Sequence, residues 1–310
     1  MRRLPWGRLA LVAAGAALLV AAACEPIVNA PPGGGTVVHQ TFRLGPFNLA
    51  PMGQSGSENQ GTQANVPRPT GAFGIKTMNF DVVDANGNPV DRSMVHLHHV
   101  LLMTSARQDQ FCSRPERFAG AGAERTPLSL YGPYAYMVGA GDSWNALWHV
   151  MNMSDQAQSV YIQYDIGYQP GATSTNSRPV TPFFLDVTGC GNSEYNVPGT
   201  GGPNSVFTTT RTFTAPWDGY LVTAGGHLHE GGIDITIHDD ASGLSCTMNA
   251  HYDPPMEPGM MNPPAEITTC PVHERIHAGG HYTVISRYDN SMPRQGVMGI
   301  VLAYAWRGTQ

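Results

Sequence analysis

The segment Ser159–Tyr168, with the sequence SVYIQYDIGY, decides the fold class. Each even-numbered position from 160 to 168 carries an apolar or aromatic residue, whereas Gln163 and Asp165 lie between them. Successive side chains of a β-strand point to opposite faces, so an alternation with a period of two predicts a strand with one face in a core. A helix would need apolar residues three and four positions apart.

Short runs of the same kind recur along the chain, and turn-forming residues such as those of Asp84–Pro89 separate them. With 36 glycines and 25 prolines, no window keeps apolar residues at helical spacing for long. The predicted fold class is therefore all-β, with two antiparallel β-sandwich domains, jelly-roll-like, in tandem. The other expected strands are Ile75–Val83, Val95–Thr104, Trp144–Met153, Val180–Val187, Val206–Thr214, Gly219–Ala224, Ile233–His238, Tyr282–Tyr288 and Val297–Trp306.

A segment rich in glycine and proline, Val197–Pro203, is the expected linker between the domains. It divides the chain into an N-terminal domain, residues 36–204, and a C-terminal domain, residues 205–310. The length of 310 residues and the hydrophobic content of 41% suffice for two separate cores.

The N-terminus has the pattern of an export signal, because arginines at positions 2, 3 and 8 precede the apolar stretch Leu9–Ala23. This pattern predicts a signal peptide of residues 1–23 and a protein that works outside the cytoplasm. Val20–Cys24 resembles a bacterial lipobox, which predicts a lipid on Cys24 that anchors the protein to the outer face of the cell membrane. Residues 24–35 would then be a Pro- and Gly-rich tether. The alternative is cleavage after an ordinary A-x-A motif, which would leave Cys24 as a free thiol.

The remaining cysteines, Cys112, Cys190, Cys246 and Cys270, are even in number, as expected for disulfides in an oxidising compartment. Four cysteines allow three pairings. We favour Cys112 with Cys190 and Cys246 with Cys270, because each pair then stays within one expected domain.

The formal net charge is −6, and Lys76 is the single lysine. This composition excludes a basic patch for nucleic acid. The expected partners are a small-molecule substrate and, through the lipid, the membrane.

Three histidines, His96, His98 and His99, lie in one expected strand. Imidazole is a common ligand for transition metals. On a regular strand His98 and His99 point to opposite faces, so both reach one metal only where the strand twists or bulges. His96 shares the face of His98 and is an alternative ligand. These residues would otherwise be solvent-facing strand positions.

The second histidine motif is His227-Leu228-His229, flanked by glycines. An H-x-H pair on a strand places both imidazoles on one face, which predicts a bidentate metal site. The alternative is a polar surface strand. By themselves, His149 and Met298 would be read as ordinary residues of apolar strands.

The order of these motifs resembles that of the peptidylglycine α-hydroxylating and dopamine β-monooxygenases, which are copper type II, ascorbate-dependent enzymes. The resemblance implies two copper ions, ascorbate or another external reductant, and hydroxylation of a substrate C–H bond with oxygen. The implied catalytic and metal-binding residues are His98, His99 and His149 for an electron-transferring copper, and His227, His229 and Met298 for the copper that binds oxygen.

Some positions depart from that family. Where the peptidylglycine enzymes carry an Arg that binds the substrate carboxylate, this chain has Gly225, and Ile300 and Leu302 replace two further polar contacts. These departures predict a less polar substrate that is not anchored by its carboxylate. They also favour a rival, a non-catalytic copper-binding or copper-delivery lipoprotein, to which the methionines of the segment 256–261 would contribute.

A weaker resemblance, around Phe80–His99, is to plant stress-upregulated nodulin-type proteins. This resemblance does not indicate which activity the protein has. A third interpretation is a cell-surface sandwich module whose histidines bind nothing.

Overall fold

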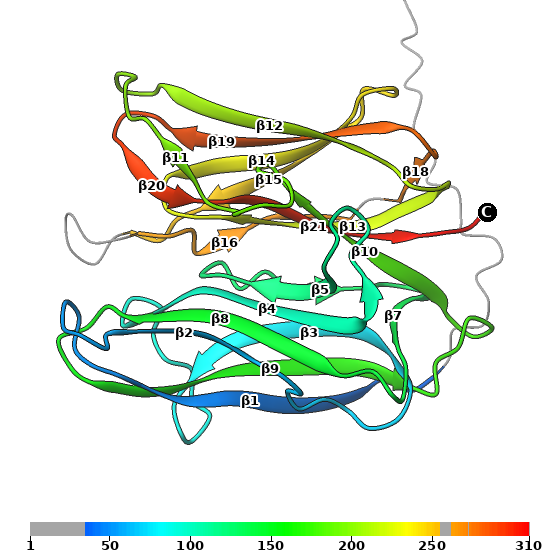
Figure 1. Ribbon diagram of the computed structural model, residues 1–310, viewed down its shortest axis with the longest axis horizontal. Helices are drawn as coiled ribbons and strands as arrows, with labels where there is room; N and C mark the ends of the chain where they lie inside the picture. The colour runs from blue at the N-terminus through cyan, green and yellow to red at the C-terminus, as the bar shows by residue number, and fades with distance from the viewer. Residues whose placement is uncertain (1–34, 255–261, 272, 310) are drawn as a thin grey trace, which may run out of the picture. The chain divides into compact units, whose positions relative to one another are not determined.

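The computed structural model describes residues 35–254, 262–271 and 273–309. The expected signal peptide, most of the tether, Cys24 and the methionines of the segment 256–261 lie outside the described residues. Every helix or strand in the described part is a β-strand, from β1 to β21 (Figure 1). The predicted all-β fold is therefore confirmed.

The first sandwich buries its core between two layers of strands (Figure 1). One layer has the order β1 (Val38–Leu49), β9 (Gln158–Pro170), β3 (Phe73–Val83) and β7 (Tyr134–Val138), with β6 (Leu128–Ser129) beside β3. The other has the order β2 (Glu58–Gln63), β8 (Trp144–Asn152), β4 (Val95–Gln108) and β5 (Pro115–Ala121).

The second sandwich has the same plan. One layer has β10 (Arg178–Asp186), β21 (Gly299–Trp306) and β13 (Gly219–Leu228), with β17 (Thr269–Cys270) and β18 (Glu274–Ile276) beside β13. The other has the order β12 (Val206–Thr214), β19 (His281–Asp289), β14 (Gly232–Asp239), β15 (Ser245–His251) and β16 (Glu266–Ile267). A short pair, β11 (Tyr195–Val197) and β20 (Arg294–Val297), completes the described strands.

One sheet runs through both sandwiches. The parallel pairing of β7 with β10 joins a layer of each into a single ten-stranded sheet. Strands β10 and β11 precede the expected domain boundary at residue 204, yet they pair with β21 and β20, which follow it. The described residues form one compact unit.

The quoted segment forms most of β9, and its alternation is visible in the burial of its side chains. Every even-numbered residue from 160 to 168 is buried in the first core, whereas Tyr161, Gln163 and Asp165 are partly exposed. The period of two therefore predicted both the strand and the face that it buries.

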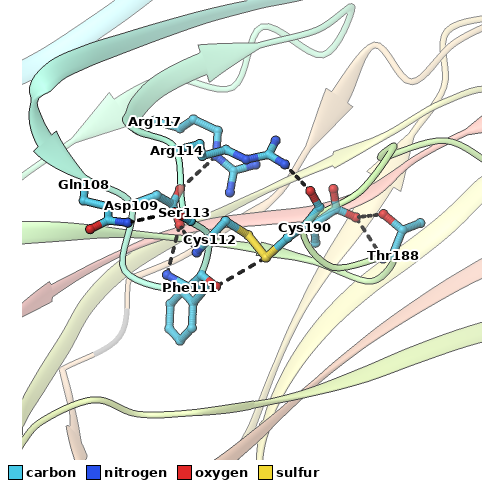
Figure 2. Close-up of a disulfide and its surroundings, with 10 residues drawn as sticks. Gln108, Asp109, Phe111, Cys112, Ser113, Arg114, Arg117, Thr188 and Cys190 are labelled. Carbon is cyan, nitrogen blue, oxygen red and sulfur yellow. Dashed lines mark hydrogen bonds and ion pairs between the residues drawn. A yellow bond between two sulfur atoms is a disulfide. The ribbon is translucent and has the colours of Figure 1, made fainter.

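Disulfides join Cys112 to Cys190 and Cys246 to Cys270, which is the pairing that we favour from the sequence. Cys112 lies in the turn between β4 and β5 of the first sandwich, and Cys190 follows β10 of the second (Figure 2). This disulfide therefore connects the two sandwiches instead of staying inside one. Disulfides persist in oxidising compartments, so the protein is exported from the cytoplasm.

None of the described residues forms a helix that is long and apolar enough to cross a membrane.

We predict that Phe118→Ala destabilises the fold by about 3–5 kcal/mol, because it empties a fully buried site. Phe118 stacks on Tyr136 and contacts Trp144, with ring centroids 4.9 Å away in both cases. Chemical denaturation measures the change. The control is Tyr131→Ala, at a side chain that is 73% exposed, which should change stability by less than about 0.5 kcal/mol. Equal effects of both substitutions would contradict this account of the core.

Candidate functional site

A β-bulge in β4 places His98 and His99 on the same face of the sheet. The pairing with β8 shifts between Leu97, opposite Val150, and His99, opposite His149, so that His98 is the extra residue. Leu97 and Val100 both point into the first core. On a regular strand, residues three positions apart would point to opposite faces. Such a bulge is what His98 and His99 need in order to reach one site from consecutive positions of a strand.

The bulge creates a group of three imidazoles. Among the described histidines, cysteines and carboxylates, His98, His99 and His149 are the only group of three or more whose donor atoms all lie within 4.8 Å of one another. Nδ1 of His98 and Nδ1 of His99 are 3.0 Å apart, and the ring centroids of His98 and His149 are 4.7 Å apart. Nε2 of His149 lies 3.0 Å from Oε2 of Glu58. Nδ1 of His149 is therefore the nitrogen that remains to bind a metal.

The H-x-H motif lies directly beside this group. His227 is near the end of β13 and His229 follows that strand, with ring centroids 5.1 Å apart. The ring of His229 is 4.3 Å from that of His98, across the boundary between the sandwiches. The histidines of the two expected ligand sets therefore form one continuous cluster instead of two separate sites.

Hydrogen bonds fix the orientation of both rings of the motif. Nδ1 of His227 donates to Oε1 of Glu124 over 3.1 Å, and Nδ1 of His229 donates to the carbonyl of Gly296 over 2.8 Å. Both Nε2 atoms are buried without a hydrogen-bond partner. A neutral imidazole that donates from Nδ1 has a free lone pair on Nε2, as metal-binding histidines do.

The other two predicted residues lie at the margin of the cluster. His96 is buried, with its ring 5.7 Å from that of His98, but it is not part of the three-imidazole group. Met298 is buried, packs with Phe184 and Ile300, and lines the same cavity as His227.

Burial favours the uncharged form of His98, His99, His229 and the neighbouring His96. It lowers the pKa of His99 to about 3 and that of His96 to about 4. Burial, followed by the nearby imidazoles, also lowers the pKa of His98 and of His229. Neutral imidazoles do not have to lose a proton to bind a metal.

Glu124 is an acidic residue that the sequence analysis missed. Its side chain is 1% exposed, and burial by itself would raise its pKa, but His227 and backbone N–H groups, including that of Gly122, lower the pKa overall. The carboxylate therefore stays charged beneath His227. Nothing in the local sequence distinguishes Glu124 from a surface residue.

A cavity of about 380 Å³ lies beside the cluster, and the strands of its wall come from both sandwiches. His99, His227 and Met298 line it, together with apolar side chains such as Leu101 and Leu302. A volume of this size falls within the range of small-molecule sites, roughly 300–1,000 Å³.

Comparison with known families identifies the family of this chain. Residues 149–305, slightly more than half of the 310 residues, match the family described as Stress up-regulated Nod 19. The chain belongs to this family. The weaker of the two resemblances therefore named the right family, although the match lies at residues 149–305 and not around Phe80–His99.

The solved structures that resemble this member of the Stress up-regulated Nod 19 family do so weakly. A peptide-N(4)-(N-acetyl-β-D-glucosaminyl) asparagine amidase has 11% identity and a TM-score of 0.45, over 88% of this chain and 97% of that chain. PNGase F, a glycosylasparaginase from Flavobacterium meningosepticum, has 11% identity and a TM-score of 0.42, over the same shares. The major capsid protein P2 of bacteriophage PM2 has 8% identity and a TM-score of 0.37, over 88% of this chain and 99% of that chain. Likenesses at this level carry no activity over. No curated protein sequence gives a significant match.

The expected membership of the copper type II monooxygenases is wrong, because the family match is to Stress up-regulated Nod 19. The expectations derived from that resemblance are corrected with it. They are an oxidoreductase, two copper ions, ascorbate, and the copper-delivery rival. The physical reason is that the resemblance rested on very short motifs, and the order of a few ligands along a β-protein does not specify a family. The roles as copper ligands carried over to His98, His99, His149, His227, His229 and Met298 lose that support.

Gly122 allows the ring of His227 to reach Glu124. A Cβ atom at position 122 would lie 2.4 Å from Cε1 of His227 and 2.7 Å from Oε2 of Glu124. We predict that Gly122→Ala displaces the imidazole and costs about 1–3 kcal/mol of stability, as overpacking does. Denaturation and the NMR signals of His227 measure both effects. The control is Gly141→Ala, where no atom lies within 4 Å of the added Cβ. A Gly122→Ala protein as stable as the control, with unchanged His227 signals, would contradict the packing described here.

Proposed function

We propose that this exported protein binds a divalent transition-metal ion of the zinc class at His98, His99 and His149. The observation that carries the proposal is the convergence of three imidazoles, with donor atoms within 4.8 Å of one another. Imidazole nitrogen is a preferred donor for such ions.

Three protein ligands leave one position of a tetrahedral ion for water or another small molecule. The contact between His149 and Glu58 supports the assignment, because a carboxylate on the second nitrogen orients a metal-binding histidine. The neighbouring cavity supports a role in binding a small molecule next to the ion.

His227 and His229 extend this centre from the second sandwich. Their unpartnered, buried Nε2 atoms support a role in binding the small molecule next to the ion, because a buried acceptor without a partner is unfavourable. Met298 lines the same cavity as His227 and would contact a molecule that occupies it.

The test is titration of the metal-free protein with Zn²⁺ by calorimetry, together with the absorption spectrum of the Co²⁺ form. We expect His99→Ala to weaken Zn²⁺ binding by more than about 100-fold, beyond the roughly 10–100-fold effect of losing an outer partner. The matched control is His281→Ala, because His281 is an exposed histidine of β19 outside the cluster. The proposal fails if the wild-type protein binds no Zn²⁺, or if both variants bind it equally well.

We also propose that Cys24 carries a lipid and that residues 24–35 tether the folded part to the membrane. The lipobox-like Val20–Cys24 supports this, and the disulfides agree with the compartment that it implies.

In a bacterial host, we expect the full-length protein to partition into the detergent phase of Triton X-114. Cys24→Ala should move it to the aqueous phase or leave the precursor uncleaved, and mass spectrometry of the N-terminal peptide identifies the lipid. Aqueous partitioning of the wild-type protein would contradict the anchor. The control, Cys112→Ala, removes a disulfide cysteine and should leave the partitioning unchanged.

A further inference from the structure

Arg117, on β5, lines the cavity but is only partly hydrogen-bonded. The residue is 3% exposed, and its Nε donates to Oδ2 of Asp109 over 2.8 Å. Its Nη2 atom is buried without a hydrogen-bond partner. A buried guanidinium that is not fully paired is unfavourable, so it indicates an acceptor that the folded chain does not itself provide.

The guanidinium of Arg117 is held in place on two sides. Asp109, which pairs with it, also accepts the backbone N–H groups of Phe111 and Cys112 through Oδ1. The guanidinium carbon lies 3.7 Å from the ring centroid of Phe184, another residue of the cavity wall. Arg117 therefore cannot turn toward another acceptor without breaking these contacts.

A second arginine lines the same end of the cavity. Arg114 donates to the carbonyl of Cys190, next to the disulfide that connects the sandwiches (Figure 2). The acidic groups nearby are Asp109, Asp186, which acts on Arg117 without a hydrogen bond between them, and the exposed Glu194. None of them completes the hydrogen bonding of Nη2.

The wall between this end and the histidines is apolar. Arg117 pairs with Met103 across β4 and β5, and His99 is four residues from Met103 along β4, which corresponds to about 13 Å at the rise of a strand. Leu101 lies between them and lines the cavity with Leu302. The cavity thus offers an unsatisfied cationic donor at one end, an apolar middle, and the imidazole cluster at the other.

We propose that the cavity binds a small apolar carboxylate, in the class of medium-chain fatty acids. The carboxylate accepts hydrogen bonds from the free side of Arg117, with Arg114 nearby, and the apolar chain runs along β4 toward His99. Carboxylate and guanidinium form strong, charge-assisted hydrogen bonds, and the apolar chain fills a wall that offers little to a polar ligand. Only the placement of the chain end beside a metal rests on the proposed function.

The test compares decanoate with decanol, which have the same chain but different end groups, by calorimetry on the metal-free full-length protein below micelle-forming concentrations. We expect decanoate to bind at least about tenfold more tightly than decanol, as a charged hydrogen bond provides. Equal affinities, or no binding of either, would overturn the proposal. This comparison needs no variant, so it does not depend on how a mutant folds.

Arg117→Lys keeps the positive charge beside Asp109 but removes the forked donor. It should lower decanoate affinity about tenfold and leave decanol affinity unchanged. The matched control is Arg287→Lys, because Arg287 also pairs with an aspartate, Asp234, but does not line the cavity. Equal decanoate affinities of the two variants would overturn the role of Arg117.

Repeating the titration on protein loaded with Zn²⁺ separates this proposal from the metal site. If decanoate binds equally well with and without metal, the carboxylate site is supported. If, in addition, the His99→Ala variant binds Zn²⁺ normally, the proposed metal centre is wrong. If His99→Ala loses Zn²⁺ binding and the protein shows no preference for decanoate over decanol, the metal centre is supported and the carboxylate site is wrong.

Discussion

The candidate site depends on a packing constraint in β4. Leu97 and Val100 both bury their side chains in the first core, which a regular strand does not allow at that separation. The chain accommodates both by inserting His98 as a bulge residue opposite β8. Two consecutive imidazoles then lie on the outer face of the sheet, against His149. The apolar contacts of one face thus create the polar site on the other.

The contact between the two sandwiches determines the rest of the site. The ten-stranded sheet passes from one sandwich to the other through β7 and β10, and the disulfide between Cys112 and Cys190 connects them again. Tyr304 donates to the carbonyl of Phe118 over 2.7 Å across the same boundary. These connections explain why His229 can lie against His98 and why burial lowers the pKa of both imidazoles. The same boundary holds the cavity, the buried carboxylate of Glu124 and the incompletely paired Arg117.

The family assignment shows the limit of reasoning from ligand order. The motifs around His98, His149, His227 and Met298 occur in an order that another enzyme family shares, but each is only one to three residues long. Few strands are needed to arrange histidines in that order, so the pattern has little power to discriminate between families. The match over residues 149–305 uses about half of the chain and therefore outweighs it. The residues that lie together remain those that the motifs singled out, with His98, His99 and His149 forming the tightest group.

The sequence by itself determined the all-β class and the strand at Ser159–Tyr168 with its buried face. These features follow from local alternation and from simple counts, which the chain carries without reference to distant residues. Only the tertiary structure decided that β10 joins the second sandwich, that the expected histidine ligands form one cluster, and that Glu124 and Arg117 line the cavity beside it. Each of these depends on contacts between segments far apart in the chain. Glu124 and His227, for example, are 103 positions apart, and no local pattern records such a contact.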